Sequence, residues 1–193
     1  STPTITLQED ISVNRFTFDY SGLGGFNQSA SFDGNGSRTI TFNGADPTIH
    51  TVAGEYRKPI FRPGLALVSP AGMTRSTDDF RGRLLIHCDA SGIQGAWTNE
   101  GGQTFVDADG SNTGTLSGLS TLRIDGGVVR IDSGSTGVND QLADDADVEL
   151  RGKNANLTYL GTRHSTTPST ETIDRLVLRT HGVLNVAGAG GSG

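Results

Sequence analysis

The sequence has little of what most globular domains use to build a core. Hydrophobic residues make up 33% of the 193 residues and aromatic residues 6%, with one cysteine, one methionine and one tryptophan. A single cysteine excludes an internal disulfide framework. No apolar run approaches the roughly 20 residues of a membrane-spanning helix, so we expect no membrane span in this segment. The fold must therefore depend on backbone hydrogen bonds and stacked side chains.

Positive charge is also scarce. Fifteen basic residues face 21 acidic ones, which gives a net charge of −6, and the only lysines are Lys58 and Lys153. There is no basic run, so we expect no nucleic-acid partner. The acidic residues are mostly Asp, which favours turns, whereas Lys and Glu favour helices. This bias points away from helical structure.

Small and turn-forming residues are abundant instead, since Gly, Thr, Ser, Asp and Asn make up nearly half of the chain. The apolar residues fall in short alternating strings such as Ile5-Thr-Leu7, Phe16-Thr-Phe18 and Val183-Leu-Asn-Val186. Such alternation is typical of half-buried strands. No stretch keeps the i, i+3, i+4, i+7 apolar spacing of a helix over three turns. The sequence therefore predicts an all-β chain with many turns.

Several strand-like segments echo one another. Val13–Phe18 and Ile173–Leu178 share the template apolar, Asn or Asp, Arg, apolar, any residue, apolar. Thr39–Gly44 and Thr121–Gly127 are both short alternating strands that end in Asn-Gly or Asp-Gly. Internal similarity of this kind favours a stack of repeated coils over a single closed sandwich.

A β-solenoid accounts for this composition. In a parallel β-helix, inward apolar residues stack on the same positions of the next coil, and strands of neighbouring coils lie about 4.8 Å apart. Corners need positive φ angles and close backbone approach, which Gly, Asn and Asp supply. At roughly 24 residues per coil the chain would form roughly eight coils. The alternative is a β-sandwich or jelly roll, which would ordinarily carry more aromatic residues.

We expect a single solenoid segment with three parts. Residues 1–54 form N-terminal coils and residues 102–193 form repeat-like C-terminal coils. The middle part, 55–101, matches the repeat least, because it holds Pro59, Pro63, Pro70, Met73, Cys88 and Trp97. We expect it to be an irregular excursion from one face of the stack, or a less regular coil.

The C-terminal part carries a series of short motifs in a fixed order. Thr121–Gly127 has the pattern "T-L-x-I-x-x-G", and Leu142–Leu150 has the pattern "L-x-D-x-A-x-V-x-L". The "L-x-L-x-G", "E-T-I-x-x-L-x-L" and "G-x-L-x-V" elements correspond to Leu157–Gly161, Glu171–Leu178 and Gly182–Val186. This series resembles the autotransporter-associated β-strand repeats of bacterial surface proteins. The likeness is interrupted by Arg163–Thr170, and the middle third of the chain departs from it.

This resemblance implies a right-handed parallel β-helix that is extracellular or at the cell surface, where it serves as a stalk or adhesive surface without catalysis. We therefore expect a non-enzymatic structural or adhesive segment of a bacterial surface or filament protein. The alternatives are a carbohydrate-active β-helix enzyme and a viral tail-fibre or capsid-decorating protein. Thr2–Leu7 and Leu184–Gly193 carry no charge cluster that would block pairing. The expected partners are thus further copies or adjoining repeats, stacked end to end, together with surface glycans.

Calcium is the one cofactor that the sequence suggests. Asp107-Ala-Asp-Gly-Ser-Asn112 begins like a calcium loop, but its twelfth position is Gly118 rather than the Glu of an EF-hand. Asp107 and Asp109 could still form a looser site, as could a second group. That second group is Asp144, Asp145 and Asp147. The alternative is that both are solvated turns.

No catalytic residue is predicted. His87-Cys88-Asp89 offers a nucleophile beside a base, but consecutive strand residues point to opposite faces, which favours a buried thiol. The nearest approach to a carbohydrate-active cluster is Asp78-Asp79 with Arg81 and Arg83. We interpret it as a charged loop.

Overall fold

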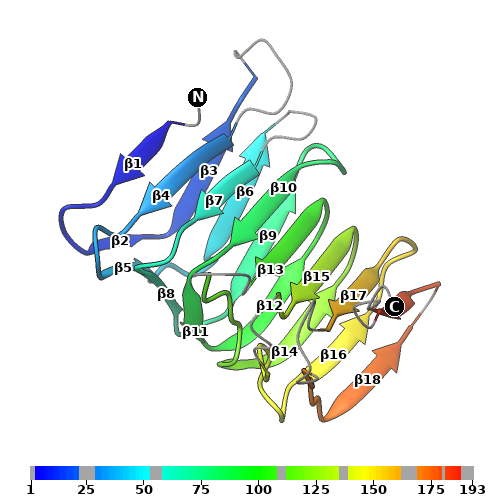
Figure 1. Cartoon of the computed structure of the whole chain (residues 1–193). Coiled ribbons are helices and arrows are strands. Elements are labelled where there is room, and N and C mark those ends of the chain that lie inside the picture. Colours follow the sequence, from blue (N-terminus) through cyan, green and yellow to red (C-terminus); the bar gives the residue numbers. More distant parts are fainter. Residues whose placement is uncertain are drawn as a thin grey trace, which may run out of the picture.

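The structure, a computed structural model, describes residues 3–21, 29–52, 58–107, 112–134, 139–161, 169–179 and 181–187. Within these ranges the chain forms 19 strands and no helix, and hence no helix that could cross a membrane. The strands build three sheets, and every pairing within them is parallel. The all-β parallel β-helix predicted from the sequence is confirmed (Figure 1).

The first and largest sheet has eight strands and runs the length of the stack. Its strands are β1 (Thr4–Thr6), β4 (Ser29–Asp33), β7 (Lys58–Phe61), β10 (Arg83–Ile86), β13 (Gln103–Asp107), β15 (Val128–Asp132), β17 (Asn156–Leu160) and β19 (Val183–Ala187).

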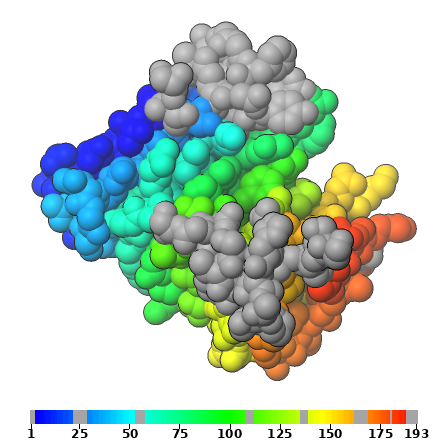
Figure 2. Space-filling model, in the orientation of Figure 1, coloured from blue at the N-terminus to red at the C-terminus, as the bar shows by residue number. Residues whose placement is uncertain are grey.

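The second sheet has four strands and the third has seven. The second contains β2 (Ile11–Val13), β5 (Arg38–Phe42), β8 (Leu65–Ser69) and β11 (Asp89–Ile93). The third contains β3 (Arg15–Asp19), β6 (Thr48–Val52), β9 (Met73–Thr77), β12 (Gly95–Asn99), β14 (Leu119–Ile124), β16 (Asp147–Leu150) and β18 (Arg175–Leu178). In the space-filling view the sequence colours succeed one another along the stack (Figure 2).

Each coil returns the chain to the first sheet, so the register of that sheet shows the length of every turn. The longest turn pairs Ser29 with Lys58, and the shortest pairs Arg83 with Gln103. The other turns between β1 and β19 lie between these two in length, and each of these others is longer than the roughly 24 residues predicted per coil. The chain therefore completes fewer turns than the eight predicted.

The interior is built from columns of inward side chains, as strand alternation requires. In the first sheet one column runs through Phe32, Phe61, Ile86, Val106 and Ile131, which pair strand by strand and are all buried. Every coil thus covers the apolar face of the coil before it, and this burial drives the stacking.

The corners explain the glycine content. Gly127 has φ 74°, and a Cβ there would collide with the carbonyl oxygen of Gly102 in the preceding coil. Asn35, with φ 46°, occupies a similar left-handed position beside Gly36. Left-handed backbone is strained for most side chains and accessible to Gly and Asn.

The middle of the chain differs from the prediction. Instead of an irregular excursion, residues 58–101 form the six strands β7 to β12 and include the start of the shortest turn. Pro63 and Pro70 lie in turns between strands, where no ladder N–H is needed, and Pro59 is inside β7. Trp97 pairs with Met73 and both are buried. The unusual residues of this part are therefore corner and core residues of the stack itself. Register shifts in β11 and β12 make these coils less regular, which was the alternative expectation.

The second sheet ends at β11. In the following coils, isolated bridges and a side-chain hydrogen bond occupy the side of the stack where this sheet would continue. Isolated bridges join Asp89 to Thr115 and Leu116 to Leu142. The fully buried Gln141 donates from Nε2 to the Gly114 carbonyl at 2.9 Å, and its own carbonyl accepts from the Leu116 N–H at 2.6 Å. Isolated backbone bridges and one side-chain hydrogen bond thus connect the coils where the second sheet has no strand.

Candidate interaction surfaces

The last coil leaves part of the apolar interior exposed. Leu176 and Leu178 of β18 pair with Val148 and Leu150, which are completely buried. Leu176 itself is 37% exposed and Leu178 is 55% exposed. In β19, Leu184 and Val186 occupy inward positions and are 41% and 69% exposed. These four side chains, which we call the terminal apolar face, hold core positions with no coil beyond them among the described residues.

A hollow of about 330 Å³ opens beside this face. Leu184, Val186, Leu157, Ile173 and Glu171 help to line it. The Glu171 carboxylate accepts hydrogen bonds from the backbone N–H groups of Gln141 at 3.0 Å and Leu142 at 2.7 Å. Burial raises the pKa of Glu171 to about 7, although these two hydrogen bonds oppose the shift. The Glu171 carboxylate, a titratable group, thus links the final coil to the coil before it.

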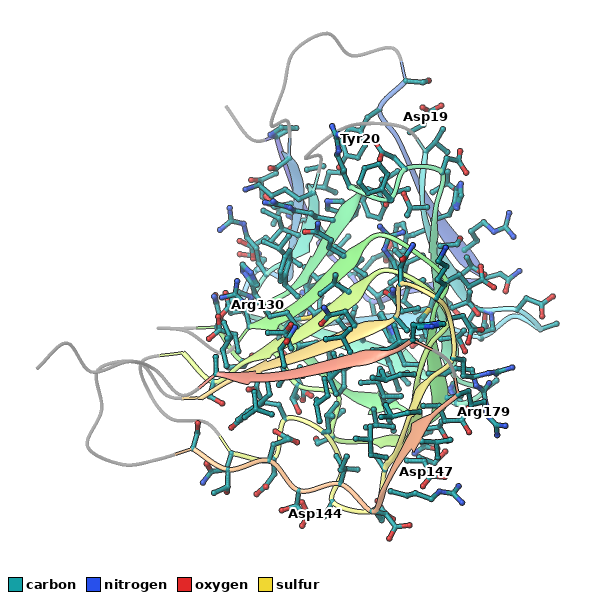
Figure 3. The ribbon with its side chains drawn as sticks, turned by 90° about the vertical axis from the view of Figure 1, so that its right-hand side faces the viewer. Asp19, Tyr20, Arg130, Asp144, Asp147 and Arg179 are labelled. Atoms are coloured by element: carbon teal, nitrogen blue, oxygen red, sulfur yellow. The ribbon has the colours of Figure 1, made fainter. Side chains whose placement is uncertain are left out.

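The opposite end presents the free edges of β1 and β3. Ile5 of β1 faces inward beside Phe32 and is 49% exposed, while Phe16 of β3 is half-buried. β3 and β18 are the two edge strands of the third sheet, and they carry the two copies of the shared template. Figure 3 shows Asp19 at one end of the stack and Asp144 at the other.

A row of outward side chains crosses the middle of the first sheet. Arg83 of β10, Phe105 of β13 and Arg130 of β15 form what we call the arginine–phenylalanine row. The guanidinium carbons of Arg83 and Arg130 lie 5.8 Å and 5.5 Å from the centre of the Phe105 ring, within cation–π range. A hollow of about 210 Å³ lies along the row and is also lined by Asp107 and Asp132. Arg130 is labelled on the outer side of this sheet in Figure 3.

His87 lies beside this hollow. Its Nε2 is 3.6 Å from the Asp107 carboxylate, and Asn112 donates to the same carboxylate at 3.4 Å. Burial is the main cause that lowers the pKa of His87, opposed by Asp107 and reinforced by Arg62 and Lys58. The neighbouring Cys88 is completely buried, and burial raises the pKa of its thiol, as for the buried thiol expected from the sequence.

The described residues do not bring three of the predicted calcium ligands together. Asp109 lies outside the described residues, and Asp107 contacts His87 and Asn112. Asp147 is bound by the guanidinium of Arg175, while Asp144 and Asp145 lie in an exposed turn. Across the described ranges, no group of three or more His, Cys, Asp or Glu side chains is placed to hold a metal ion.

One arrangement was not predicted, because its members lie a coil apart in the sequence. His50 of β6 hydrogen-bonds through Nδ1 to the Ser76 hydroxyl at 2.8 Å, and its Nε2 is 3.4 Å from the Asp78 carboxylate. Serine, histidine and aspartate in contact resemble a nucleophile, base and orienting acid. A serine nucleophile also needs N–H donors for the oxyanion. Here the adjacent Asp78 N–H already donates to Thr51 across the ladder, which favours a structural cross-strand contact.

The charged cluster near residue 80 is divided between two faces. Asp78 contacts His50, while the Asp79 carboxylate accepts from the Arg81 N–H at 2.9 Å in a local turn. Arg81 lies over the exposed Phe80, and Arg83 faces outward from the first sheet in the arginine–phenylalanine row. The four residues do not form one acid–base site. The sequence-based interpretation as a charged loop applies to Asp78, Asp79 and Arg81, and Arg83 of β10 is the exception.

Comparison with known proteins gives no match to a family model, to a curated protein or to a solved structure. The likeness to autotransporter-associated repeats therefore stays a prediction, and proposals about function depend on the surfaces above.

Proposed function

We propose that this chain is a non-enzymatic structural and adhesive β-solenoid segment of an extracellular filament or surface protein, which extends by end-to-end stacking of coils. The observation that carries the proposal is the terminal apolar face. Leu176, Leu178, Leu184 and Val186 occupy core positions and are 37 to 69% exposed. A further coil would bury them just as each coil buries the one before it.

The first coil of a second copy has the features needed to cover this face. Continuing the parallel register of the third sheet places Phe16 and Phe18 of β3 against Leu176 and Leu178, because the shared template aligns them. The same register places Asp19 opposite Arg179, which are both exposed in the single chain. Edge strands that can still pair in parallel are ready templates for another chain. Such head-to-tail contacts do not close, so they generate filaments.

The test measures particle length by electron microscopy and mass by sedimentation over a range of concentrations. We expect the natural sequence to form rods longer than one solenoid, and Leu178→Asp or Val186→Asp to shorten them to single units. Phe80→Asp is the matched control, because Phe80 is 72% exposed but lies in a turn away from the end of the stack. It should leave the rods unchanged.

A charge exchange tests the register itself. Arg179→Asp should weaken assembly through repulsion with Asp19, and adding Asp19→Arg should restore it. The same register brings Arg15 beside Arg175, whose guanidinium is already paired with Asp147. Single, monodisperse particles of the natural sequence at high concentration would overturn stacking by a second copy. Rods that both aspartate variants leave intact would place the contact elsewhere on the molecule.

A further inference from the structure

The outward face of the first sheet gathers cations in a chain whose net charge is −6. Arg83 and Arg130 lie on either side of Phe105 in the stack, and Lys58 and Arg62 are near enough to His87 to lower its pKa. Asp107 and Asp132 are the carboxylates in the hollow. Asp33, the residue after Phe32, lies beside Arg62 in register and is a third carboxylate on this stretch. Four permanent cations thus face three carboxylates, so this stretch carries a small net positive charge in an acidic chain.

Asp132 holds one of these cations in place. The Asp132 side chain is 3% exposed, is paired with the Arg130 guanidinium, and accepts from the Gly134 N–H at 3.1 Å. Asp132 therefore fixes the position of Arg130, whose side chain remains 32% exposed to solvent. A guanidinium held in this way by a carboxylate and an aromatic ring loses less conformational entropy when it binds an anion.

The remaining groups specify the chemistry of a ligand. Guanidinium groups bind carboxylates through paired N–H donors. Phe105 and Leu85, adjacent in register, provide apolar surface for the C–H face of a sugar ring. The Asp107 carboxylate, 26% exposed, can accept hydrogen bonds from hydroxyl groups. Carboxylate, hydroxyl and apolar ring face occur together in a uronic acid.

We propose that the hollow along Arg83, Phe105 and Arg130 binds an acidic saccharide of the uronate type. The proposal deepens the adhesive role proposed above, because it names the chemical class that the side of the rod recognises. The repeat of the coils at about 4.8 Å sets the spacing of the contacts along the stack. An extended polymer lying along the coil axis would meet Arg130, Phe105 and Arg83 in turn.

The test is calorimetric titration with galacturonate oligosaccharides, with neutral gluco-oligosaccharides of equal length as the comparison. Arg130→Ala and Phe105→Ala should each weaken uronate binding at least tenfold. The matched control is Arg123→Ala on the third sheet, because Arg123 is 31% exposed and is paired with Glu149 much as Arg130 is with Asp132. It should leave the affinity unchanged.

Two conservative variants distinguish the loss of a ligand contact from the loss of the folded state. Arg130→Lys keeps the charge without the planar fork and should bind more weakly than the natural protein. Phe105→Tyr keeps the ring and should bind normally. No uronate binding by the folded chain, equal binding of neutral sugars, or an equal loss in Arg123→Ala would overturn the proposal. Rod formation is measured separately, so failure here would leave the stacking proposal standing.

Discussion

The first three coils and the last coil differ in how their inward side chains are packed. Phe16, Phe18, Phe32, Phe42 and Phe61 form one aromatic cluster in coils one to three, with ring centres 5.2 to 6.2 Å apart. The last coil offers aliphatic side chains that remain partly exposed. We therefore expect a buried inward residue of the first three coils to stabilise the chain more than a partly exposed inward residue of the last coil.

The largest expected effect comes from breaking the aromatic cluster. Phe61 is fully buried and its ring packs against Phe16, Phe18 and Phe32, so Phe61→Ala should cost about 3 to 5 kcal/mol. Urea unfolding followed by circular dichroism measures the loss. A cost below about 1 kcal/mol would show that the first coils do not depend on aromatic packing.

Replacement of Arg75, which also lies in the first three coils, should increase the stability of the chain. It is fully buried at an inward position of β9, and its guanidinium donates to the Ser76 carbonyl. Burial lowers the pKa of Arg75 to about 10, which reflects the cost of removing its charge from water. Arg75→Met should therefore raise the free energy of unfolding by about 1 to 3 kcal/mol. Destabilisation by this change would mean that a counter-charge compensates Arg75.

Glu171 should make the stability of the chain depend on pH through a contact of the last coil. Its pKa is raised from 4.5 to about 7 in the folded chain, so the folded state retains a proton that the unfolded state releases between these values. Stability therefore falls as pH rises through this interval, by about 1 to 2 kcal/mol because the carboxyl is partly solvated. Glu171→Gln should remove this slope. Urea midpoints at pH 5 and pH 7.5 compare the two chains, and an unchanged slope would assign it to another group.

The smallest effect is expected at the terminal apolar face. Leu178 is 55% exposed, so Leu178→Ala should change the stability of the single chain by less than about 1 kcal/mol. The measurement is made at a concentration where the chain does not assemble. At concentrations that produce rods, the same change should cost more, since the proposed second copy buries this side chain. Equal costs at both concentrations would contradict stacking at β18.

Much of the fold was predictable from local patterns. Phe16-Thr-Phe18 and Thr39–Phe42 alternate strongly, and the structure has strands there, within β3 and β5. The strands that the sequence did not predict are β4 (Ser29–Asp33), β7 (Lys58–Phe61), β9 (Met73–Thr77), β11 (Asp89–Ile93) and β12 (Gly95–Asn99). Their own apolar alternation is weak, so pairing with neighbouring coils stabilises them more than their own residues do.

The sequence by itself determined the all-β class, the glycine-rich corners, the excess of negative charge and the echo between Val13–Phe18 and Ile173–Leu178. These follow from residue type and spacing along one strand. Only the tertiary structure decided which residues meet across coils. Arg83, Phe105 and Arg130 are brought together by the register of three successive coils, which differ in length. A register that varies from coil to coil has no fixed sequence period, so it is set by packing of the whole stack.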